Sequence, residues 1–220
     1  MATRQVLAEL VDGFQKLSGS QVDIESVGGV DAAKRVQAGE AFDVVVLASD
    51  AIDKLIASGH VQAGSKVDLV RSGVAVAVRA GAKRPDILTE DAVRIAVLAA
   101  RNISYSTGPS GVALARLFER WGIADEVKGR IVQAPPGVPV GTLVARGEVE
   151  LGFQQLSELL NLEGITLLGP LPPAIQIITT FSAGICISSL KGDAVRTMLG
   201  YMNSPEAVAT KLAQGMDPVG

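Results

Sequence analysis

The 220-residue chain has 48% hydrophobic and 20% charged residues, and its 20 basic and 23 acidic side chains give a net charge of −3. A chain of this length buries a sizeable core, either as one domain or as two small lobes. Its slightly acidic balance and its 4% of aromatic residues do not match the basic stripe and stacking platform of nucleic-acid binders, so we expect no nucleic-acid partner.

The first part of the chain alternates helical and extended patterns. Apolar residues at helical spacing predict a helix over residues 6–17, which Ser18-Gly19-Ser20 ends. Residues 22–27 alternate in polarity and predict a strand, which Gly28-Gly29 ends. The elements predicted next are a helix over 32–38, a buried strand over 42–47, a helix over 49–58 and a long strand through 74–78.

The same alternation continues to the end of the sequence. The predicted helices cover residues 89–100, 112–121, 138–146, 193–201 and 205–214. The predicted strands cover residues 102–106, 131–134, 149–154, 175–181 and 184–188, and Pro135-Pro136-Gly137 predicts a loop. Strands that alternate with helices through short connections predict an α/β fold with mostly parallel sheets flanked by helices.

Residues that ligate metals or bind nucleotides are scarce. The single cysteine, Cys186, excludes a multi-cysteine metal site, and the single histidine, His60, excludes a zinc site built mainly from imidazoles. The glycine spacings of the phosphate-binding loop and of dinucleotide folds are missing. We therefore expect neither a metal nor a cofactor.

The apolar runs are short. The run over residues 95–100 is far below the roughly 20 residues that a membrane-spanning helix needs, so we expect no membrane span. The first residues show neither the basic start nor the apolar stretch of a secretory signal. These features predict a cytoplasmic protein as the chain stands, or a periplasmic one if it is a mature or truncated form.

Polar residues follow several predicted strands, where ligands bind in open α/β sheets. They carry neutral hydroxyls, amides or no side chain, and the start of the first helix adds a hydroxyl and one cation. The first turn of a helix also offers unpaired backbone N–H groups to an anion. The sequence therefore predicts a site for a small anion, with contacts from Thr3, Arg4, Gly28, Gly29, Ser49, Ser106, Thr107, Ser110 and Gln155.

Each of these motifs also has a purely structural interpretation. Residues 107–111 can be a capped helix start with a proline turn, and Gly28-Gly29 can be a tight turn. Gln154 and Gln155 point to opposite faces of a strand, so at most one is expected to contact a ligand. Arg4 can be a solvated residue, although a cation in the first turn of a helix is slightly unfavourable.

Residues 28–50, 107–111 and 149–155 resemble the type II periplasmic solute-binding fold, and most closely the molybdate-binding protein family. The resemblance covers nearly the whole chain. It implies two lobes, residues 1–75 with 178–220 and residues 76–177, which crossing strands join and which close on a ligand in the cleft between them. It also implies oxyanion contacts near Thr3, Gly28 or Gly29, Ser110, Pro139 and Gln155.

The chain departs from that family at several points. A glycine replaces the hydroxyl expected after the second strand, and Gln155 replaces a tyrosine. The family also has a strand before its first helix, whereas this sequence begins at the helix. Together with the cation at Arg4, the extra space that glycine leaves suits a larger organic carboxylate.

Two functions follow from the resemblance. The first is a receptor for a small anion, whose partner would be a membrane transporter. The alternative is a cofactor-independent isomerase that resembles aconitate isomerase and moves a proton along a tricarboxylate. Such an enzyme needs a base close to an acidic C–H, for which the candidates are Asp50, Glu25 and Tyr105. The sequence leaves open the choice between the two and the identity of the ligand.

Overall fold

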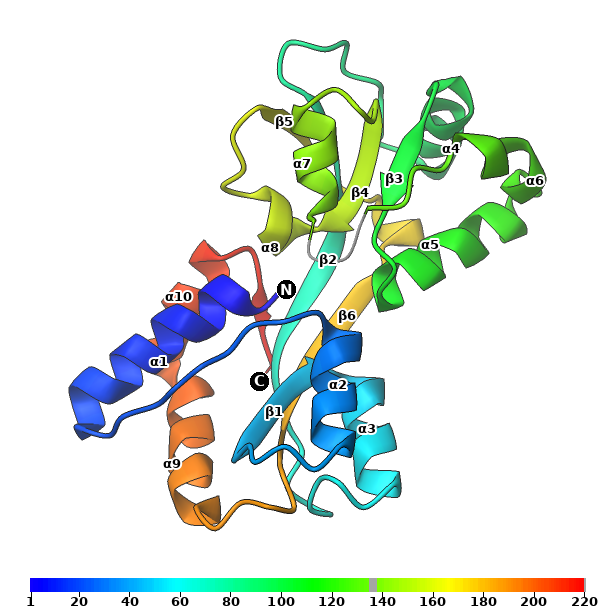
Figure 1. Ribbon diagram of the computed structural model, residues 1–220. Coiled ribbons are helices and arrows are strands. Elements are labelled where there is room, and N and C mark those ends of the chain that lie inside the picture. The colour runs from blue at the N-terminus through cyan, green and yellow to red at the C-terminus, as the bar shows by residue number, and fades with distance from the viewer. Residues whose placement is uncertain (135–137, 220) are drawn as a thin grey trace. The chain divides into compact units, whose positions relative to one another are not determined.

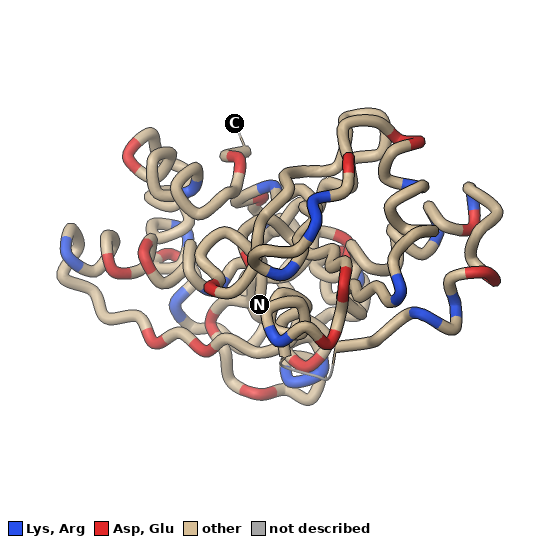
Figure 2. Tube along the Cα trace, turned by 90° about the horizontal axis from the view of Figure 1, so that it is seen from above, with Lys and Arg blue, Asp and Glu red and all other residues tan. Residues whose placement is uncertain are grey.

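The computed structural model describes residues 1–134 and 138–219 (Figure 1). The chain forms two compact units: unit 1 comprises Met1–Ser72 with Thr179–Gly220, and unit 2 comprises Gly73–Ile178. The loop predicted over residues 135–137 lies outside the described residues. Lys and Arg are interspersed with Asp and Glu along both units, as a net charge of −3 leads one to expect (Figure 2).

Two strand pairs of unit 1 run antiparallel. Strand β1 (Val44–Ala48) pairs with β6 (Ile178–Ile185), with Val44 opposite Ile185. The first part of β2 (Val67–Arg79) follows β6 in the sheet and pairs with the short β7 (Asp217–Pro218). The run of β-branched residues in β1 favours a strand, because such side chains pack well on a pleated surface.

Helices cover both faces of this sheet (Figure 1). Val44 and Val46 face the cluster that also includes Leu10 and Met198, whereas Val45 and Leu47 face the opposite cluster. The helical elements of unit 1 are α1 (Arg4–Ser18), α2 (Gly29–Gln37), α3 (Ser49–Ala57), α9 (Gly192–Met202), the 3-10 helix η3 (Pro205–Ala207) and α10 (Val208–Ala213). The apolar stripe predicted over residues 6–17 is therefore the buried face of α1.

A lysine is buried in unit 1. Lys211 is 1% exposed, and its Nζ donates hydrogen bonds to the carbonyl oxygen of Leu69 and to Oδ1 of Asn203, each at 2.8 Å. Burial lowers the pKa of this ammonium below its ordinary value. Neutral oxygens, rather than a carboxylate, thus hold the charge.

The sheet of unit 2 is mixed. Strand β4 (Leu151–Gln155) and strand β5 (Ile165–Pro170) both run antiparallel to the second part of β2. Strand β3 (Ile103–Tyr105) runs parallel to β4, with Tyr105 opposite Phe153.

The prediction of mostly parallel sheets is therefore wrong, because most pairings in both units are antiparallel. Apolar periodicity shows that a segment is extended and buried, but it carries no information about strand direction. The α/β class itself is confirmed.

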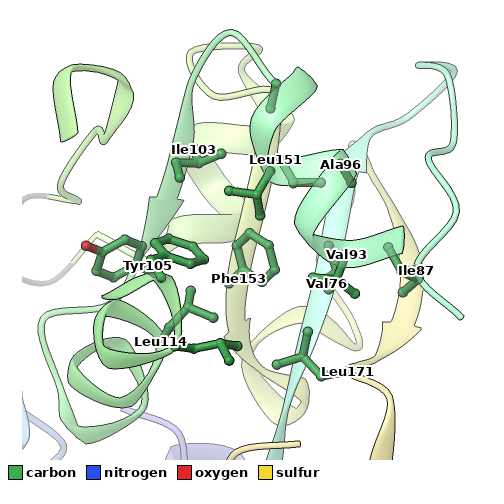
Figure 3. Close-up of a cluster of buried hydrophobic side chains, with 14 of the residues drawn as sticks. Val76, Ile87, Val93, Ala96, Ile103, Tyr105, Leu114, Leu151, Phe153 and Leu171 are labelled. Atoms are coloured by element: carbon green, nitrogen blue, oxygen red, sulfur yellow. The ribbon is translucent and has the colours of Figure 1, made fainter. Parts of the chain in front are cut away.

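Helices also cover both faces of the sheet in unit 2. The helical elements are α4 (Glu90–Ala99), α5 (Pro109–Arg120), α6 (Ala124–Val127), η1 (Lys128–Arg130), α7 (Val140–Ala145), α8 (Leu156–Leu159) and η2 (Pro173–Ile175). One face packs against α4 and α5, where Phe118 meets the rings of Tyr105 and Phe153 edge to face at 5.9 and 6.4 Å. Figure 3 shows Tyr105 and Phe153 in this cluster. The other face presents Ala75 and Ala77 to Leu159 of α8.

Three strand predictions need correction. Residues 19–28 have no regular structure, because the alternating segment 22–27 is largely exposed and pairs with no strand in the described part of the chain. The strand predicted over residues 131–134 reduces to an isolated bridge between Ile131 and Ile103. The two strands predicted over 175–181 and 184–188 form the single strand β6, which runs through the residues between them.

Candidate functional site

The predicted site residues of unit 2 gather where β3 leads into α5. Ser106 follows β3, and its Oγ lies 3.1 Å from Oγ of Ser110, which is 6% exposed. Gly108 precedes α5 and Pro109 opens it, where a missing N–H does no harm because first-turn N–H groups have no partner within the helix. Thr107, in the same loop, is exposed.

Gly111 makes this tight turn possible. A Cβ at this position would lie 1.6 Å from the carbonyl oxygen of Ser106, far inside any real contact. Only glycine lets the first turn of α5 approach the backbone of residue 106 so closely. The Ser106–Ser110 pair therefore depends on a residue without a side chain.

The end of β4 lies beside this turn. Because β3 and β4 are parallel and Tyr105 lies opposite Phe153, the residues that follow the two strands share one edge of the sheet. Gln154 and Gln155 are both 4% exposed. The backbone N–H of Gly141, in the first turn of α7, donates to Oε1 of Gln154 at 3.1 Å.

Gln154 thus anchors the start of α7, whereas the side chain of Gln155 points to the other face of the strand. Pro139, which is half-buried, immediately precedes α7. We call this group the carboxyl edge of unit 2; it consists of Ser106, Thr107, Ser110, Pro139 and Gln155.

The carboxyl edge of unit 2 is rich in neutral donors. Ser106 and Ser110 supply hydroxyls, Gln155 supplies an amide, and the first turn of α5 supplies backbone N–H groups that have no partner within the helix. None of its five residues carries a charge. Such a set suits an anion, which charge-assisted hydrogen bonds can hold without a cation.

In unit 1 the predicted residues lie at the starts of three helices. Thr3 precedes α1 and is 9% exposed, and Arg4 is the first residue of α1. Gly28 precedes α2, and the Cα of Gly29 faces Leu47 near the end of β1. Neither glycine has a positive φ, so their backbone conformation does not require glycine.

Ser49, half-buried, opens α3 directly after β1. The starts of α2 and α3 therefore meet at the end of β1, because Gly29 packs against Leu47 two residues before Ser49. Arg4 lines a hollow of about 340 Å³ together with Ala8, Ile24 and Ser26. The hollow brings the start of α1 to the segment that leads into α2, a proximity that sequence reasoning missed because the alternating pattern of residues 22–27 predicted a strand there.

The three candidate bases differ in their surroundings. Asp50 is exposed and lies 3.6 Å from Nζ of Lys54, and Glu25 lies 2.7 Å from Nη1 of Arg35. Burial raises the pKa of the Tyr105 phenol, and its hydroxyl points away from Phe153 and Leu114 (Figure 3). Both carboxylates are thus ion-paired, and Tyr105 stays protonated at neutral pH.

Across the described residues, no group of three or more His, Cys, Asp or Glu side chains could hold a metal ion. No helix in the same part of the chain is long and apolar enough to cross a membrane.

Comparison with known proteins places the chain in a family. The bacterial extracellular solute-binding protein family matches residues 1–217. The chain belongs to this family. A curated relative of this solute-binding protein, the aconitate isomerase of Pseudomonas sp., is 38% identical over 221 residues, covering 97% of this chain and 83% of the relative.

Solved structures show the same fold. The periplasmic molybdate-binding protein of Azotobacter vinelandii has a TM-score of 0.82 at 23% identity, over 100% of this chain and 96% of that protein. The substrate-binding domain of a putative molybdenum ABC transporter from Clostridium difficile has a TM-score of 0.77 at 14% identity, with the same coverage. The predicted resemblance to molybdate-binding proteins is therefore confirmed at the level of the fold.

Proposed function

We propose that this solute-binding protein is a cofactor-independent isomerase that interconverts cis- and trans-aconitate or a closely related tricarboxylate. The observation that carries the proposal is the 38% identity to an aconitate isomerase, which extends over 97% of the chain. Similarity spread along the whole sequence involves the residues of both units rather than one shared element.

Each unit, taken by itself, offers donors that suit a carboxylate. The hydroxyls of Ser106 and Ser110 and the first turn of α5 can donate to carboxylate oxygens. In unit 1, Arg4 adds a cation, which a ligand with several negative charges needs more than a small oxyanion does.

The reaction is a proton shift that needs no redox partner. A base removes a proton from the methylene carbon, the electron pair of that C–H bond forms a new double bond, and the former double bond takes up a proton at its far carbon. Charge develops on the neighbouring carboxylate during the shift. Hydrogen-bond donors already fixed around that carboxylate stabilise the developing charge.

Tyr105 is our candidate for returning the proton. It is the last residue of β3, next to Ser106, and a phenol carries its proton at neutral pH, as a general acid requires. Tyr105→Phe keeps the ring that packs against Phe118 and removes only the hydroxyl. We expect this variant to bind the substrate normally and to lose most of its turnover.

Proton NMR in deuterium oxide tests the activity. Purified protein is mixed with cis-aconitate, and the trans isomer is expected to appear together with loss of the methylene proton signal to deuterium. A parallel thermal-shift titration measures binding, because occupancy raises stability by mass action. Binding without conversion or exchange would overturn the isomerase and support the receptor function instead.

A further inference from the structure

A proton shift along a tricarboxylate needs a base, and the three candidates taken from the sequence do not suit that role. Asp50 is exposed and lies 3.6 Å from Nζ of Lys54. Glu25 lies 2.7 Å from Nη1 of Arg35. Both carboxylates are already paired with cations, and the phenol of Tyr105 holds its proton at neutral pH. The base must therefore be another residue.

Glu158 is an acidic residue at the edge of the sheet in unit 2 where Ser106 lies. It belongs to α8, which begins directly after β4, and it follows Gln155, the last residue of β4, by three positions. Because β3 and β4 are parallel, the segments that follow the two strands share this edge. Glu158 is thus the acidic residue that α8 brings to the carboxyl edge of unit 2.

The amide of Gln154 holds the Glu158 carboxyl. Oε1 of Gln154 accepts the N–H of Gly141 at 3.1 Å, so the NH2 end of the same amide is available as a donor. Gln154 is also hydrogen-bonded to Glu158, and an ionised carboxyl can only accept. The amide therefore donates to the carboxylate and links it to the start of α7.

The helix that carries Glu158 is fixed by packing. Leu159, the next residue, is 1% exposed and packs against Ala75 and Ala77 of β2. A Cβ at Gly141 would lie 2.9 Å from Cδ2 of Leu159, so α7 packs directly against α8. A carboxyl on such an element is held in one position before a ligand arrives.

No lysine or arginine in the described part of unit 2 forms an ion pair with Glu158. The glutamates that form ion pairs in this unit are Glu90, Glu126, Glu148 and Glu150. Glu158 is half-buried, and burial raises the pKa of its carboxyl above the ordinary value, which the Gln154 hydrogen bond offsets only in part. A carboxylate in such a place is a stronger base than an exposed one.

This arrangement costs stability. An ionised carboxyl in a half-buried position without a lysine or arginine partner is unfavourable for the fold. The neighbouring Ser157 adds a buried Oγ that has no hydrogen-bond partner among the described residues. Sequences accept such local costs mainly at functional sites, so a catalytic role explains Glu158 better than a structural role does.

We propose that Glu158, held by Gln154, is the general base of the isomerisation. The proposal rests on the proposed function. Starting from cis-aconitate, the Glu158 carboxylate takes a proton from the methylene carbon, and the electron pair of that C–H bond forms the new double bond. The former double bond takes up the phenolic proton of Tyr105 at its far carbon. Proton exchange with water then returns both side chains to their starting states.

Proton NMR of cis-aconitate in deuterium oxide tests the base separately from the acid. The proteins are the wild type, Glu158→Gln, Glu163→Gln and Tyr105→Phe. Glu158→Gln keeps the shape of the side chain and can still accept the hydrogen bond from Gln154, but it cannot take a proton. Glu163→Gln is the matched control, because it removes the same charge from an exposed position of the same unit.

We expect Glu158→Gln to lose both methylene exchange and conversion by about 10²–10⁴-fold, the usual contribution of a general base. Tyr105→Phe should lose conversion but keep methylene exchange, because Glu158 can still remove the proton and return a deuteron to the same carbon. Glu163→Gln should match the wild type. Formate should restore exchange to Glu158→Ala, since it supplies the missing carboxylate.

Two measurements show that Glu158→Gln is folded and binds. Its thermal midpoint at pH 7 should equal or exceed that of the wild type, because an ionised carboxyl whose pKa is raised in the folded state destabilises the fold above that pKa. Calorimetric titration with the unreactive propane-1,2,3-tricarboxylate should give equal or tighter binding, because the substitution removes a negative charge that repels the ligand.

The possible failures are distinct. Methylene exchange by Glu158→Gln at the wild-type rate overturns the role of Glu158 and leaves the isomerase intact. A loss of exchange that weaker tricarboxylate binding accounts for, or that formate does not reverse in Glu158→Ala, also overturns the base. A wild-type protein that neither converts nor exchanges aconitate overturns the isomerase, and the base with it.

Discussion

Replacing Gly111 by alanine tests the geometry of the carboxyl edge of unit 2 directly. The added Cβ would lie 1.6 Å from the carbonyl oxygen of Ser106 and 3.1 Å from Cδ2 of Tyr105. Both neighbours are hard to move, because one is backbone and the other is a ring in the main core cluster. The loop before α5 or the start of the helix must therefore shift.

The size of the shift sets the expected cost. Real Cβ atoms essentially never approach another heavy atom within 3.0 Å, so the two atoms must separate from 1.6 Å to at least that distance. Overpacking of a well-packed site costs about 1–3 kcal/mol and occasionally more, and a displaced backbone lies at the upper end. We expect Gly111→Ala to lower the free energy of unfolding by about 3 kcal/mol and to separate Ser106 from Ser110.

Gly200→Ala is the matched control. Gly200 lies inside α9, and a Cβ there would meet no heavy atom within 4 Å, so the change should stabilise the protein by about 0.5–1 kcal/mol through helix propensity. The two substitutions then differ by about 3.5–4 kcal/mol, or roughly 7–16 °C in thermal midpoint for a chain of this size. Calorimetry and urea unfolding measure both variants. A Gly111→Ala protein as stable as Gly200→Ala would refute the tight turn described above.

Three further predictions concern single side chains. Ser110→Ala should weaken carboxylate binding by about tenfold with little change in the free energy of unfolding. Thr89→Ala, which removes the cap of α4 in the same unit, should cost about 1 kcal/mol of stability and leave the affinity unchanged. Ligand titration measures the first effect and urea unfolding the second. Burial lowers the pKa of Lys211, so between that lowered pKa and 10.5 the unfolded chain binds a proton that the folded chain lacks. The free energy of unfolding should therefore rise with pH across this window. Lys211→Met should flatten the rise, and an equal slope in both proteins would contradict this prediction. Phe118→Ala, at 1% exposure in the main core cluster, should cost about 3–5 kcal/mol, and a loss below about 1 kcal/mol by calorimetry would mean that the cluster is loosely packed.

The helices were the most predictable part of the fold. The helix predicted over residues 6–17 is α1 (Arg4–Ser18), and the one predicted over 89–100 is α4 (Glu90–Ala99). In both, apolar residues recur on one face because a single stripe packs on a sheet, and this stripe is a property of the local sequence.

Strand direction and strand existence depended on distant residues. The pattern of residues 22–27 matches a half-buried strand, yet an alternating segment becomes a strand only when another strand is free to pair with it. Likewise, β2 pairs with β4 and β5 through residues 75 to 95 positions away, and no local pattern determines their relative direction. Periodicity therefore identified the α/β class but not the mixed sheet.

The candidate site divides in the same way. The structure brings Ser106 within 3.1 Å of Ser110, as helix-start geometry after a strand suggests. The hydrogen bond from the N–H of Gly141 to Oε1 of Gln154 gives this glutamine a structural role, which the sequence could not assign to one glutamine rather than to its neighbour. The hollow beside Arg4 was missed because Ile24 reaches it from an irregular segment, and such a path follows from tertiary contacts alone.

The discontinuous make-up of unit 1 bears on how the protein is synthesised. Among the described residues, strand β1 pairs with β6 alone, so the ladder at Val44 cannot form before Ile185, 141 residues later, has been synthesised. Unit 2 is one uninterrupted stretch and can fold on the ribosome while β1 is still exposed. The emerging chain therefore carries an unpaired valine-rich edge for most of translation, which makes the first 72 residues the part most in need of a chaperone.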